Sequence, residues 1–457
     1  MANYKAYPEY KDSGDEWLGE FPNSWDVVRL KHIASIYGRI GFRGYTVDDI
    51  VGEGEGAIVL SPSNIVDEKF SLEKKTFLRW EKYFESPEII VKENDVLLVK
   101  TGSTYGKSTI IKALGEPMTI NPQMALIKKI VVEPRFLAYW FNTSVIKSKI
   151  EVANTGSGMP TMTQENINNF PVLIPPNKLD VLIADFLDHE TAKIDNLIEK
   201  QQQLIGLLKE KRQAVISHAV TKGLNPDVPM KDSGVEWLGE VPEHWKLIKF
   251  SHCVSIRSGQ VDPRKFPYCD YWLIAPNHIV GGEGRIINLE TAKDQGADSG
   301  KYLCRTGEVI YSKIRPALVK ACLSPSDTVL CSADMYPMTS CNGLTNNFLL
   351  LYLLSDVFTR FAVNQADRVA MPKINRESLS DCKIPVPPID EQEKIYSHAR
   401  EALEKLDVLL QKSQLTIEFF QERRTALISA AVTGKIDVRD WVAPDKQDVE
   451  EPQEATA

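Results

Sequence analysis

The stretch KDSGDEWLGEFPNSW, residues 11–25, returns as KDSGVEWLGEVPEHW at residues 231–245, with eleven of the fifteen positions identical. A second pair follows, because AVISHAVT at 214–221 recurs as ALISAAVT at 426–433 with six of eight positions identical. Repetition at a fixed separation is the sequence signature of a duplicated structural unit. The chain is therefore a tandem duplication. The offset is 220 for the first pair and 212 for the second, so the second of the two intervening stretches is the shorter one.

The repeated segments frame two long stretches of nearly unrelated sequence, called insert 1 and insert 2 below. Positions 437–457 carry seven acidic and two basic side chains without apolar periodicity, which predicts disorder. The boundaries that this pattern predicts are 1–25 for the N-terminal repeat motif, 26–158 for insert 1, 159–222 for a central region with a long helix, 223–245 for the second copy of the motif, 246–370 for insert 2, 371–436 for a C-terminal region with a long helix, and 437–457 for an acidic tail.

Each copy closes with a proline-free segment that is predicted to form a long helix. Apolar residues there recur in alternating steps of three and four, the pattern of a coiled-coil seam, and the same register returns in the second copy at the offset of 212. With one such helix in each copy, we expect an internal pseudo-two-fold and an antiparallel coiled coil. The alternative is two separate helices, each covering its own domain. The expected seam residues are Ile183, Leu187, Ile194, Leu197, Leu204, Leu208, Val215, Ile395, Ala399, Ala402, Leu406, Leu409, Phe420 and Leu427.

The inserts are predicted to be mixed α/β domains, because short runs of alternating or continuous apolar residues dominate them. Residues 95–100 of insert 1 match residues 308–313 of insert 2, and Lys107 matches Lys320 at the same offset of 213. The inserts are therefore expected to share one fold and to differ in their surfaces. The predicted fold class is α+β, with two α/β domains separated by two long helices.

Charge and cysteine usage restrict the class of protein. The net charge is −8, but residues 26–155 hold 18 Lys and Arg against 16 Asp and Glu, and residues 246–366 hold 13 against 10. Mildly positive inserts on an acidic frame permit DNA binding, which depends on neutralised phosphates. The seven cysteines all lie in the second half without paired spacing, which suits a reducing cytoplasm. No apolar run approaches the length of about 20 residues that spans a bilayer, so a soluble, cytoplasmic protein is expected.

A polar stretch, TGSTYGKS at residues 101–108, follows a predicted strand and is the main candidate for binding. Polar and basic side chains at a strand end can reach a phosphate or a base edge. The alternative is an ordinary solvated loop. The candidates for contact with DNA are Lys100, Ser103, Thr104, Tyr105 and Lys107, their counterparts Lys313, Arg315 and Lys320 in insert 2, and, more weakly, Arg43, Asn64, Asn277 and His278.

The same stretch superficially resembles a phosphate-binding P-loop. That motif requires G-x-x-x-x-G-K-[ST], and here Thr101 stands at the first glycine, while KIRPALVK at 313–320 has no glycine. A nucleotide hydrolase that uses Lys107 stays open as an alternative. The histidines are scattered, and the carboxylate pairs are sequence neighbours. No catalytic and no metal site is predicted.

Taken together, these segments resemble the DNA specificity subunit of type I restriction-modification systems. The resemblance rests on the two openers, the GSGMP loop from Gly156 to Pro160, IPVPPIDEQ at 384–392, and the A-x-I-S-x-A-V-T closures. It covers all but the acidic tail. Two departures are that Leu179-Asp180 replace the Glu391-Gln392 pair in the first copy, and that ADRVAMP in the second copy lacks the glycine loop.

The resemblance implies a division of labour. The inserts would be target recognition domains, each reading one half of an asymmetric bipartite DNA target, while the coiled coil would set the spacer and dock methyltransferase subunits. The chain would be a non-catalytic subunit without a cofactor of its own. S-adenosylmethionine, ATP and magnesium would act on the methyltransferase and the restriction (motor) subunits, and no membrane would be involved. A purely structural coiled-coil adaptor is the remaining alternative.

Overall fold

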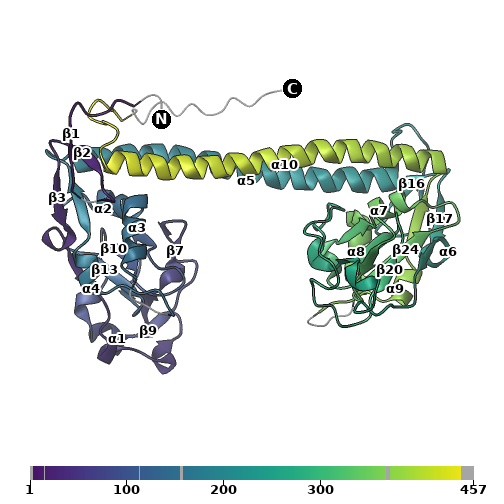
Figure 1. Cartoon of the computed structure of the whole chain (residues 1–457), viewed down its shortest axis with the longest axis horizontal. Helices are drawn as coiled ribbons and strands as arrows, with labels where there is room; N and C mark the ends of the chain where they lie inside the picture. The colour runs from purple at the N-terminus through teal and green to yellow at the C-terminus, as the bar shows by residue number, and fades with distance from the viewer. Residues whose placement is uncertain (1–3, 15, 113, 155–157, 367–370, 444–457) are drawn as a thin grey trace. The chain divides into compact units, whose positions relative to one another are not determined.

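The computed structural model describes residues 4–14, 16–112, 114–154, 158–366 and 371–443. The chain divides into two compact units. Unit 1 combines Met1–Lys200 with Thr416–Ala457, and unit 2 consists of Gln201–Leu415 (Figure 1). The division passes through both long helices, whereas the boundaries predicted along the sequence kept each helix within one segment. Each unit therefore contains one insert and a part of each helix.

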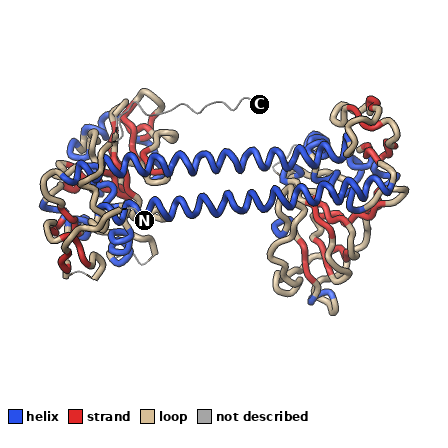
Figure 2. The backbone as a smooth tube through the Cα atoms, turned by 90° about the horizontal axis from the view of Figure 1, so that it is seen from above, coloured by secondary structure: helices blue, strands red, loops and turns tan. Residues whose placement is uncertain are grey.

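The long helices are α5 (Leu179–Lys222) and α10 (Ile389–Val432), each of 44 residues. At about 1.5 Å per residue, each is about 66 Å long. Figure 2 shows the two long helices side by side. In unit 1 the beginning of α5 packs on the end of α10, and in unit 2 the end of α5 packs on the beginning of α10. The predicted antiparallel packing is confirmed within each unit. Among the described residues, no helix is both long and apolar enough to cross a membrane.

Two ion pairs mark the helix register. Asp195 Oδ1 lies 3.1 Å from Arg424 Nε in unit 1, and Asp407 Oδ1 lies 3.0 Å from Arg212 Nε in unit 2. Asp407 is equivalent to Asp195, and Arg424 to Arg212, at the repeat offset of 212. The aspartate of each helix thus meets the arginine of the other, as an antiparallel pair of duplicated helices requires.

The predicted seam is correct near the helix ends and wrong in part between them. Ile183, Leu187 and Ile395 are fully buried. Leu197 and Leu409 are instead 43% and 48% exposed. Two helices alone bury only a narrow stripe of each other, and burial is complete where an insert domain covers the pair as a third layer.

Unit 1 holds two four-stranded sheets, and β3 (Asp26–Arg29) pairs with β14 (Pro171–Ile174) across the two ends of insert 1. The antiparallel sheet has the order β11 (Ser108–Ile110), β10 (Val96–Val99), β13 (Met124–Lys128), β4 (Ser35–Tyr37). The second sheet has the order β12 (Met118–Ile120), β6 (Gly56–Leu60), β9 (Phe77–Arg79), β5 (Ile50–Val51), with β12 and β6 parallel. The remaining elements are the hairpin β7 (Ile65–Val66) and β8 (Lys69–Phe70), and the helices α1 (Trp80–Phe84), α2 (Pro134–Phe141), α3 (Ser144–Val152) and α4 (Gln164–Asn168).

Unit 2 repeats the antiparallel sheet and the parallel strand pair of this plan, so the prediction that the inserts share one fold is confirmed for these parts. Its β17 (Lys246–Lys249) pairs with β25 (Lys383–Val386). Its antiparallel sheet has the order β18 (Val254–Ile256), β24 (Met335–Ser340), β21 (Val309–Ser312), β22 (Ala321–Leu323). A three-stranded sheet has the order β19 (Trp272–Ile274), β23 (Val329–Cys331), β20 (Tyr302–Cys304), with β19 and β23 parallel. The helices are α6 (Phe250–Cys253), α7 (Asn346–Leu354), α8 (Asp356–Gln365) and α9 (Arg376–Ser380).

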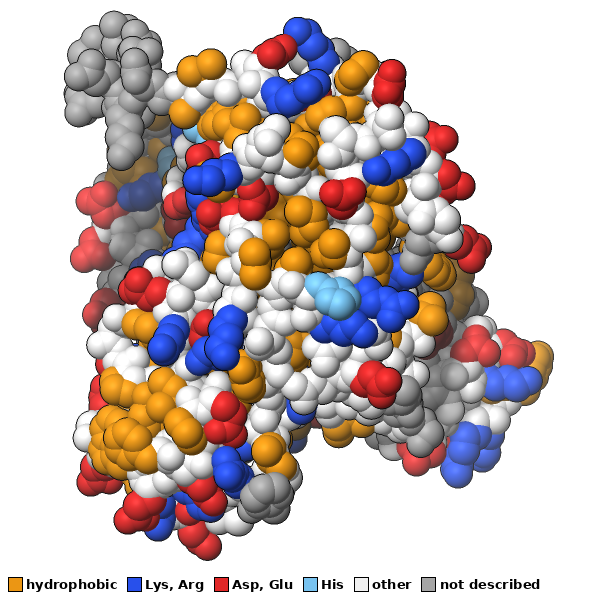
Figure 3. All heavy atoms as spheres, turned by 90° about the vertical axis from the view of Figure 1, so that its left-hand side faces the viewer, with side chains coloured by type: hydrophobic (Ala, Val, Ile, Leu, Met, Phe, Trp, Pro, Cys, Tyr) orange, Lys and Arg blue, Asp and Glu red, His pale blue; other side chains and the backbone are white. Residues whose placement is uncertain are grey.

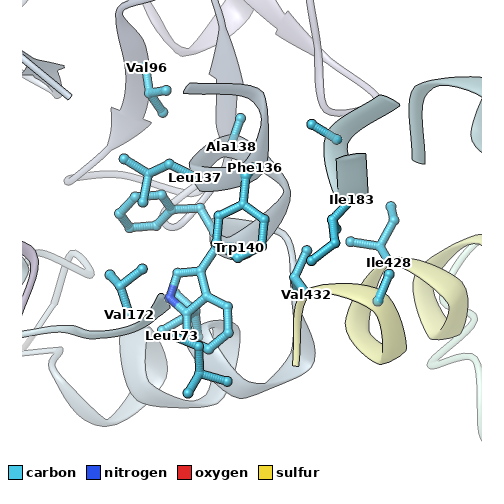
Figure 4. Packing of buried hydrophobic residues seen from close by; sticks show 14 of the residues in the cluster. Val96, Phe136, Leu137, Ala138, Trp140, Val172, Leu173, Ile183, Ile428 and Val432 are labelled. Atoms are coloured by element: carbon cyan, nitrogen blue, oxygen red, sulfur yellow. The ribbon is translucent and has the colours of Figure 1, made fainter. Parts of the chain in front are cut away.

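The core of unit 1 centres on α2, which lies between the antiparallel sheet and the long helices (Figure 4). Phe136 and Trp140 of α2 are fully buried, and the Trp140 indole Nε1 donates a hydrogen bond of 2.9 Å to the Pro171 carbonyl of β14. Val96 of the sheet and Ile428 of α10 belong to the same cluster. A single apolar layer therefore joins insert 1 to the coiled coil.

The repeated motifs fold as hairpins that cap the long helices. In unit 1 the hairpin of β1 (Tyr10–Asp12) and β2 (Glu20–Pro22) leads to Trp25, and a Cβ at Gly434 would lie 3.4 Å from this ring. In unit 2 the hairpin of β15 (Met230–Asp232) and β16 (Glu240–Pro242) leads to Trp245, against Gly223. Both glycines have positive φ, the conformation that ends a helix. Trp25 and Trp245 are both buried, so the end of each repeated motif belongs to the core of its unit.

The predicted disordered tail needs a correction for its first part, 437–443. The Asp437 amide donates a hydrogen bond of 2.8 Å to the Lys5 carbonyl, and the Trp441 ring meets Phe186 of α5 edge-on at 5.7 Å. Apolar burial of Val438 and Trp441 against unit 1 outweighs the acidic composition of this part. Residues 444–457 lie outside the described residues.

Replacing Trp25 by Ala should lower the free energy of unfolding by about 3–5 kcal/mol, because a fully buried aromatic side chain would leave a cavity. The control is Trp17→Ala in the same motif, where a side chain that is 45% exposed should cost about 1 kcal/mol or less. Urea unfolding followed by circular dichroism measures both changes. Equal losses for the two variants would contradict the packing role of Trp25.

Candidate nucleic-acid interface

The stretch TGSTYGKS forms the turn between β10 and β11 in unit 1, and it is joined to a second loop. We call residues 100–107 turn 1 and residues 158–163 Met-Pro loop 1. The Gly102 amide donates to the Pro160 carbonyl, and the Met162 amide donates to the Lys100 carbonyl, both at 3.0 Å. The Thr101 and Thr161 hydroxyls lie 2.8 Å apart. Gly156 and Ser157 of the predicted glycine loop lie outside the described residues.

Unit 2 builds the same arrangement from different residues. Residues 313–320 form turn 2 between β21 and β22, and residues 371–375 form Met-Pro loop 2. The Arg315 amide donates to the Pro372 carbonyl at 2.8 Å, and the Ile374 amide donates to the Lys313 carbonyl at 2.9 Å. Residues 367–370 of the predicted loop lie outside the described residues. The turn and the loop together are called the strand-end surface of each unit.

Lys100 is the most informative side chain of the strand-end surface in unit 1. It is partly buried, and a Cβ added at Gly38 would lie 3.0 Å from its Nζ. No carboxylate within the described part of the chain pairs with it, and burial lowers the pKa of Lys100. A cation that is withdrawn from water without a counter-ion costs free energy, and an anion would relieve this cost. Lys100 therefore has the properties of a phosphate or base contact.

The other residues of turn 1 divide into exposed and anchoring side chains. Ser103 and Lys107 are exposed. The Thr104 carbonyl accepts a hydrogen bond from the Lys107 amide at 3.2 Å and thereby closes the turn. The Tyr105 hydroxyl donates to the Ile150 carbonyl of α3 at 2.7 Å, so this ring fixes the turn to the unit. Beside Lys100, Ser103 and Lys107 are thus the exposed side chains of turn 1 that a ligand could meet.

Turn 2 presents a different set of groups. The Lys313 ammonium donates to the Ala333 carbonyl at 2.7 Å and lies 5.5 Å from the centre of the Tyr336 ring. The Lys320 ammonium donates to the Pro276 carbonyl at 2.6 Å. Arg315 is exposed, and its φ of 47° is the left-handed conformation that non-glycine residues rarely adopt. The Arg315 guanidinium is therefore the cation of turn 2 that is open to a ligand.

Asn64 and His278 are both buried, and each side chain has a structural role in a local turn. Asn64 Oδ1 accepts a hydrogen bond of 2.9 Å from the Ser61 amide, and His278 Nδ1 accepts one of 3.1 Å from the Ala275 amide. Each side chain thus closes a 3₁₀ turn, at Pro62–Asn64 and at Pro276–His278. Asn64 therefore corresponds in the fold to His278. Asn277 itself is exposed.

Arg43 lies outside turns 1 and 2. It ends the 3₁₀ turn Gly41–Arg43, and its guanidinium is 3.4 Å from the Glu88 carboxylate. Both side chains are about one third exposed. A carboxylate partner lowers the positive potential that this arginine offers to a phosphate. Arg43 is therefore a weaker candidate than Lys100 or Arg315.

The P-loop alternative is contradicted by the local fold. A P-loop joins a strand to the N-terminus of a helix, whose amides bind the phosphates. Here TGSTYGKS joins two antiparallel strands, with Val96 of β10 paired to Ile110 of β11. The turn has no helix behind it, so the structure gives Lys107 no nucleotide site of this class.

The Met-Pro loops were not among the predicted contacts. Met159 and Met371 are 58% and 44% exposed and lie beside turns 1 and 2. The sequence does contain a signal for these loops. Met-Pro occurs at 159–160 and again at 371–372, which is the repeat offset of 212. It was obscured because the residues around it differ between the copies.

Positive charge is not gathered into one continuous patch on the face of unit 1 that Figure 3 draws. On the face of unit 1 drawn in Figure 3, Lys and Arg side chains alternate with Asp and Glu. Many cations of unit 1 are paired, as Arg135 is with Asp185 and Asp188 at 2.8 and 2.9 Å. Unpaired groups such as Lys100 therefore matter more than the overall charge.

Comparison with known proteins agrees with this architecture. A family model, the type I restriction modification DNA specificity domain, matches residues 22–205 and 265–417, more than half of the chain. The type I restriction enzyme EcoDI specificity subunit of Escherichia coli is 28% identical over 333 residues, which cover 70% of this chain and 73% of that protein. The MjaVIII specificity subunit of Methanocaldococcus jannaschii is 24% identical over 367 residues, 77% of this chain and 81% of its own length.

A solved structure supports the fold independently of sequence. It comes from work on complex assembly and conformational transition of the type I R-M system, and it covers 91% of this chain and 99% of its own length. The TM-score is 0.63 at 16% identity. With the duplicated α/β units, the paired long helices and the match of the family model, the chain belongs to the type I restriction-modification DNA specificity family, as a specificity subunit with two target recognition domains.

Proposed function

We propose that each recognition domain binds one half of a split DNA target through its strand-end surface, and that the chain itself carries out no chemistry. The observation that supports this is the recurrence of one turn-and-loop arrangement in both units with different projecting side chains. Lys100, Ser103 and Lys107 belong to unit 1, and Arg315 to unit 2. The two surfaces present different side chains at different positions, so the two half-sites should differ.

The chain alone should bind DNA weakly. Its net charge is −8, and log affinity for DNA rises with the number of phosphates that cations neutralise. Methyltransferase and restriction subunits would therefore supply most of the DNA clamping, the S-adenosylmethionine chemistry and the ATP- and magnesium-dependent cleavage. The assembly would work in the cytoplasm, where DNA and these cofactors are present.

The long helices offer a surface for the methyltransferase subunits. On α5, Leu197, Leu204 and Leu207 are at least 41% exposed, and their spacing of seven and three residues places them on one helix face. On α10, Val408 and Leu415 are at least half exposed at a spacing of seven. Exposed apolar residues at helical spacing are typical of protein interfaces. These faces are the proposed docking surface.

Replacing Lys100 by Met tests the DNA contact. The variant removes the charge and keeps the length of the side chain. Because burial lowers the pKa of Lys100, its charge destabilises the fold, so the unfolding temperature should stay the same or rise. The affinity of the assembled complex for its target should fall about tenfold or more, the effect of one lost contact. Filter binding and thermal unfolding measure the two effects.

The matched control is Lys112→Met, near the other end of β11, where the ammonium is exposed and lies 3.7 Å from Asp188. This variant should retain the wild-type affinity for DNA. Wild-type affinity of Lys100→Met together with a lower unfolding temperature would assign Lys100 a structural role instead.

The docking surface is tested by Val408→Glu combined with Leu415→Glu. Burial of two such side chains contributes about 3 kcal/mol, so affinity for the methyltransferase subunit should fall about a hundredfold. Both residues are exposed in the free chain, so its helix content should not change. Glu401→Gln, on an exposed part of the same helix, is the control. Calorimetric titration measures the affinity for the methyltransferase subunit. Equal affinities of the double variant and the Glu401→Gln control would refute the assignment.

Lengthening both helices tests the spacer. Seven residues inserted after residue 203 of α5 and after residue 415 of α10 keep the heptad register and add about 10 Å, or about three base pairs. Methylation should then require a spacer about three base pairs longer between unchanged half-sites. The same insertion in α5 alone should abolish methylation. The ion pairs Asp195–Arg424 and Arg212–Asp407 could then no longer form at the same time. Altered half-sites with an unchanged spacer would contradict this role of the helices.

A further inference from the structure

Each unit contains an arginine of the coiled coil that also contacts the recognition domain of that unit. In unit 1 the Arg424 guanidinium of α10 forms an ion pair with Asp195 of α5, and its Nη1 donates a hydrogen bond of 2.8 Å to Glu68 Oε2. Glu68 belongs to the turn between β7 and β8. Arg424 therefore joins three elements, the two long helices and the β7–β8 hairpin.

The β7–β8 hairpin is held by further ion pairs. Lys69 Nζ lies 2.7 Å from Asp195 Oδ2, and Lys147 of α3 lies 2.9 Å from Glu68 Oε1. Burial raises the pKa of Glu68, but the bonds from Lys147 and Arg424 outweigh this and hold the pKa below its ordinary value. Arg424 is 17% exposed, and Glu68 and Asp195 are each 26% exposed. The network is thus shielded enough for its members to matter individually.

Unit 2 has an equivalent arginine with a different acceptor. Arg212 of α5 bonds Asp407 of α10, and its two terminal nitrogens donate to the carbonyls of Gly282 and Glu283. These carbonyls lie in the turn that joins Ile279 to Ile286, next to Pro276–His278 as the β7–β8 hairpin is next to Pro62–Asn64. The inserts share little sequence. In both, however, the arginine of the coiled coil is hydrogen-bonded to the turn at the equivalent place in the insert.

A second contact recurs in both units and makes the attachment rigid. The Ser217 hydroxyl of α5 accepts from the Asp356 amide at the start of α8 at 3.1 Å, and the Ser429 hydroxyl of α10 accepts from the Ser144 amide at the start of α3 at 3.5 Å. Each serine lies five residues beyond the arginine, about 7.5 Å along the helix. Together with the apolar layer that joins each insert to the long helices, two separated polar contacts hold the domain at one angle to the helix.

We propose that Arg212 and Arg424 are positioning residues that set the DNA spacer: each locks the coiled-coil register to the angle of the recognition domain in its own unit. This rests on the proposed function in that the angle decides where the strand-end surface meets DNA. Neither arginine needs to touch DNA. The duplication preserves the pair because each Asp must meet the Arg of the other helix.

The test uses Arg424→Met in the complex with the methyltransferase subunits. Without the guanidinium, the amides of residues 64–71 should exchange hydrogen about tenfold faster, because the hairpin loses its bond to α10 and keeps the more exposed pair of Lys69 with Asp195 of α5. On duplexes that carry the mapped target, the preference for the native spacer over spacers one base pair longer or shorter should fall about tenfold. The half-sites should not change.

Two further variants make the result decisive. Arg400→Met removes an exposed pair with Glu404 on α10 that is confined to one helix, and it should leave exchange and spacer preference unchanged. Arg424→Lys keeps a charge that reaches one carboxylate, so it should give an intermediate effect and serves if the Met variant does not fold. The proposal would be overturned if the hairpin of Arg424→Met exchanged hydrogen at the wild-type rate. It would also be overturned if that hairpin exchanged faster while the complex kept its full preference for the native spacer. If the wild-type complex showed no sequence preference, the proposed function would fail, while the exchange rates would still decide whether Arg424 holds the hairpin.

Discussion

The antiparallel register of α5 and α10 is the constraint on which the rest of the structure depends. Each helix contributes to both units, so neither unit is complete without both copies of the repeat. A shift of one helix by a single turn would separate Asp195 from Arg424 and Asp407 from Arg212 at the same time. Exposed ion pairs add little stability, but these pairs specify the helix register. Apolar packing such as that of Ile183 on Ile428 supplies the stability.

The duplication separates a fixed frame from variable surfaces. Trp25 and Trp245 are buried at helix ends in both units, so their motif cannot change without loss of packing. The side chains of turns 1 and 2 can change, because backbone hydrogen bonds hold these turns to the Met-Pro loops. A scaffold of this kind can exchange one target half-site while the helices and the other half-site stay as they are.

The sequence predicted the architecture well because repetition and helical periodicity act over many residues. The long helices, their antiparallel packing and the shared fold of the inserts all followed from these signals. Individual residues were harder, because position in a loop does not show which side chain is buried. Asn64 and His278 looked like loop residues but cap 3₁₀ turns, and Leu197 fits the seam period yet lies where no third layer covers it. The bond from Arg424 to Glu68 depends on tertiary folding and leaves no local pattern.

The most direct test of the central claim, two recognition domains that read two different half-sites, is a map of methylated adenines. The chain would be expressed with its methyltransferase subunit, and the host genome would be sequenced by a long-read method that detects the modified base. The structure predicts a single motif with two dissimilar halves and a fixed unspecified spacer. A continuous or palindromic motif, or unmodified DNA in the presence of an assembled complex, would contradict this account.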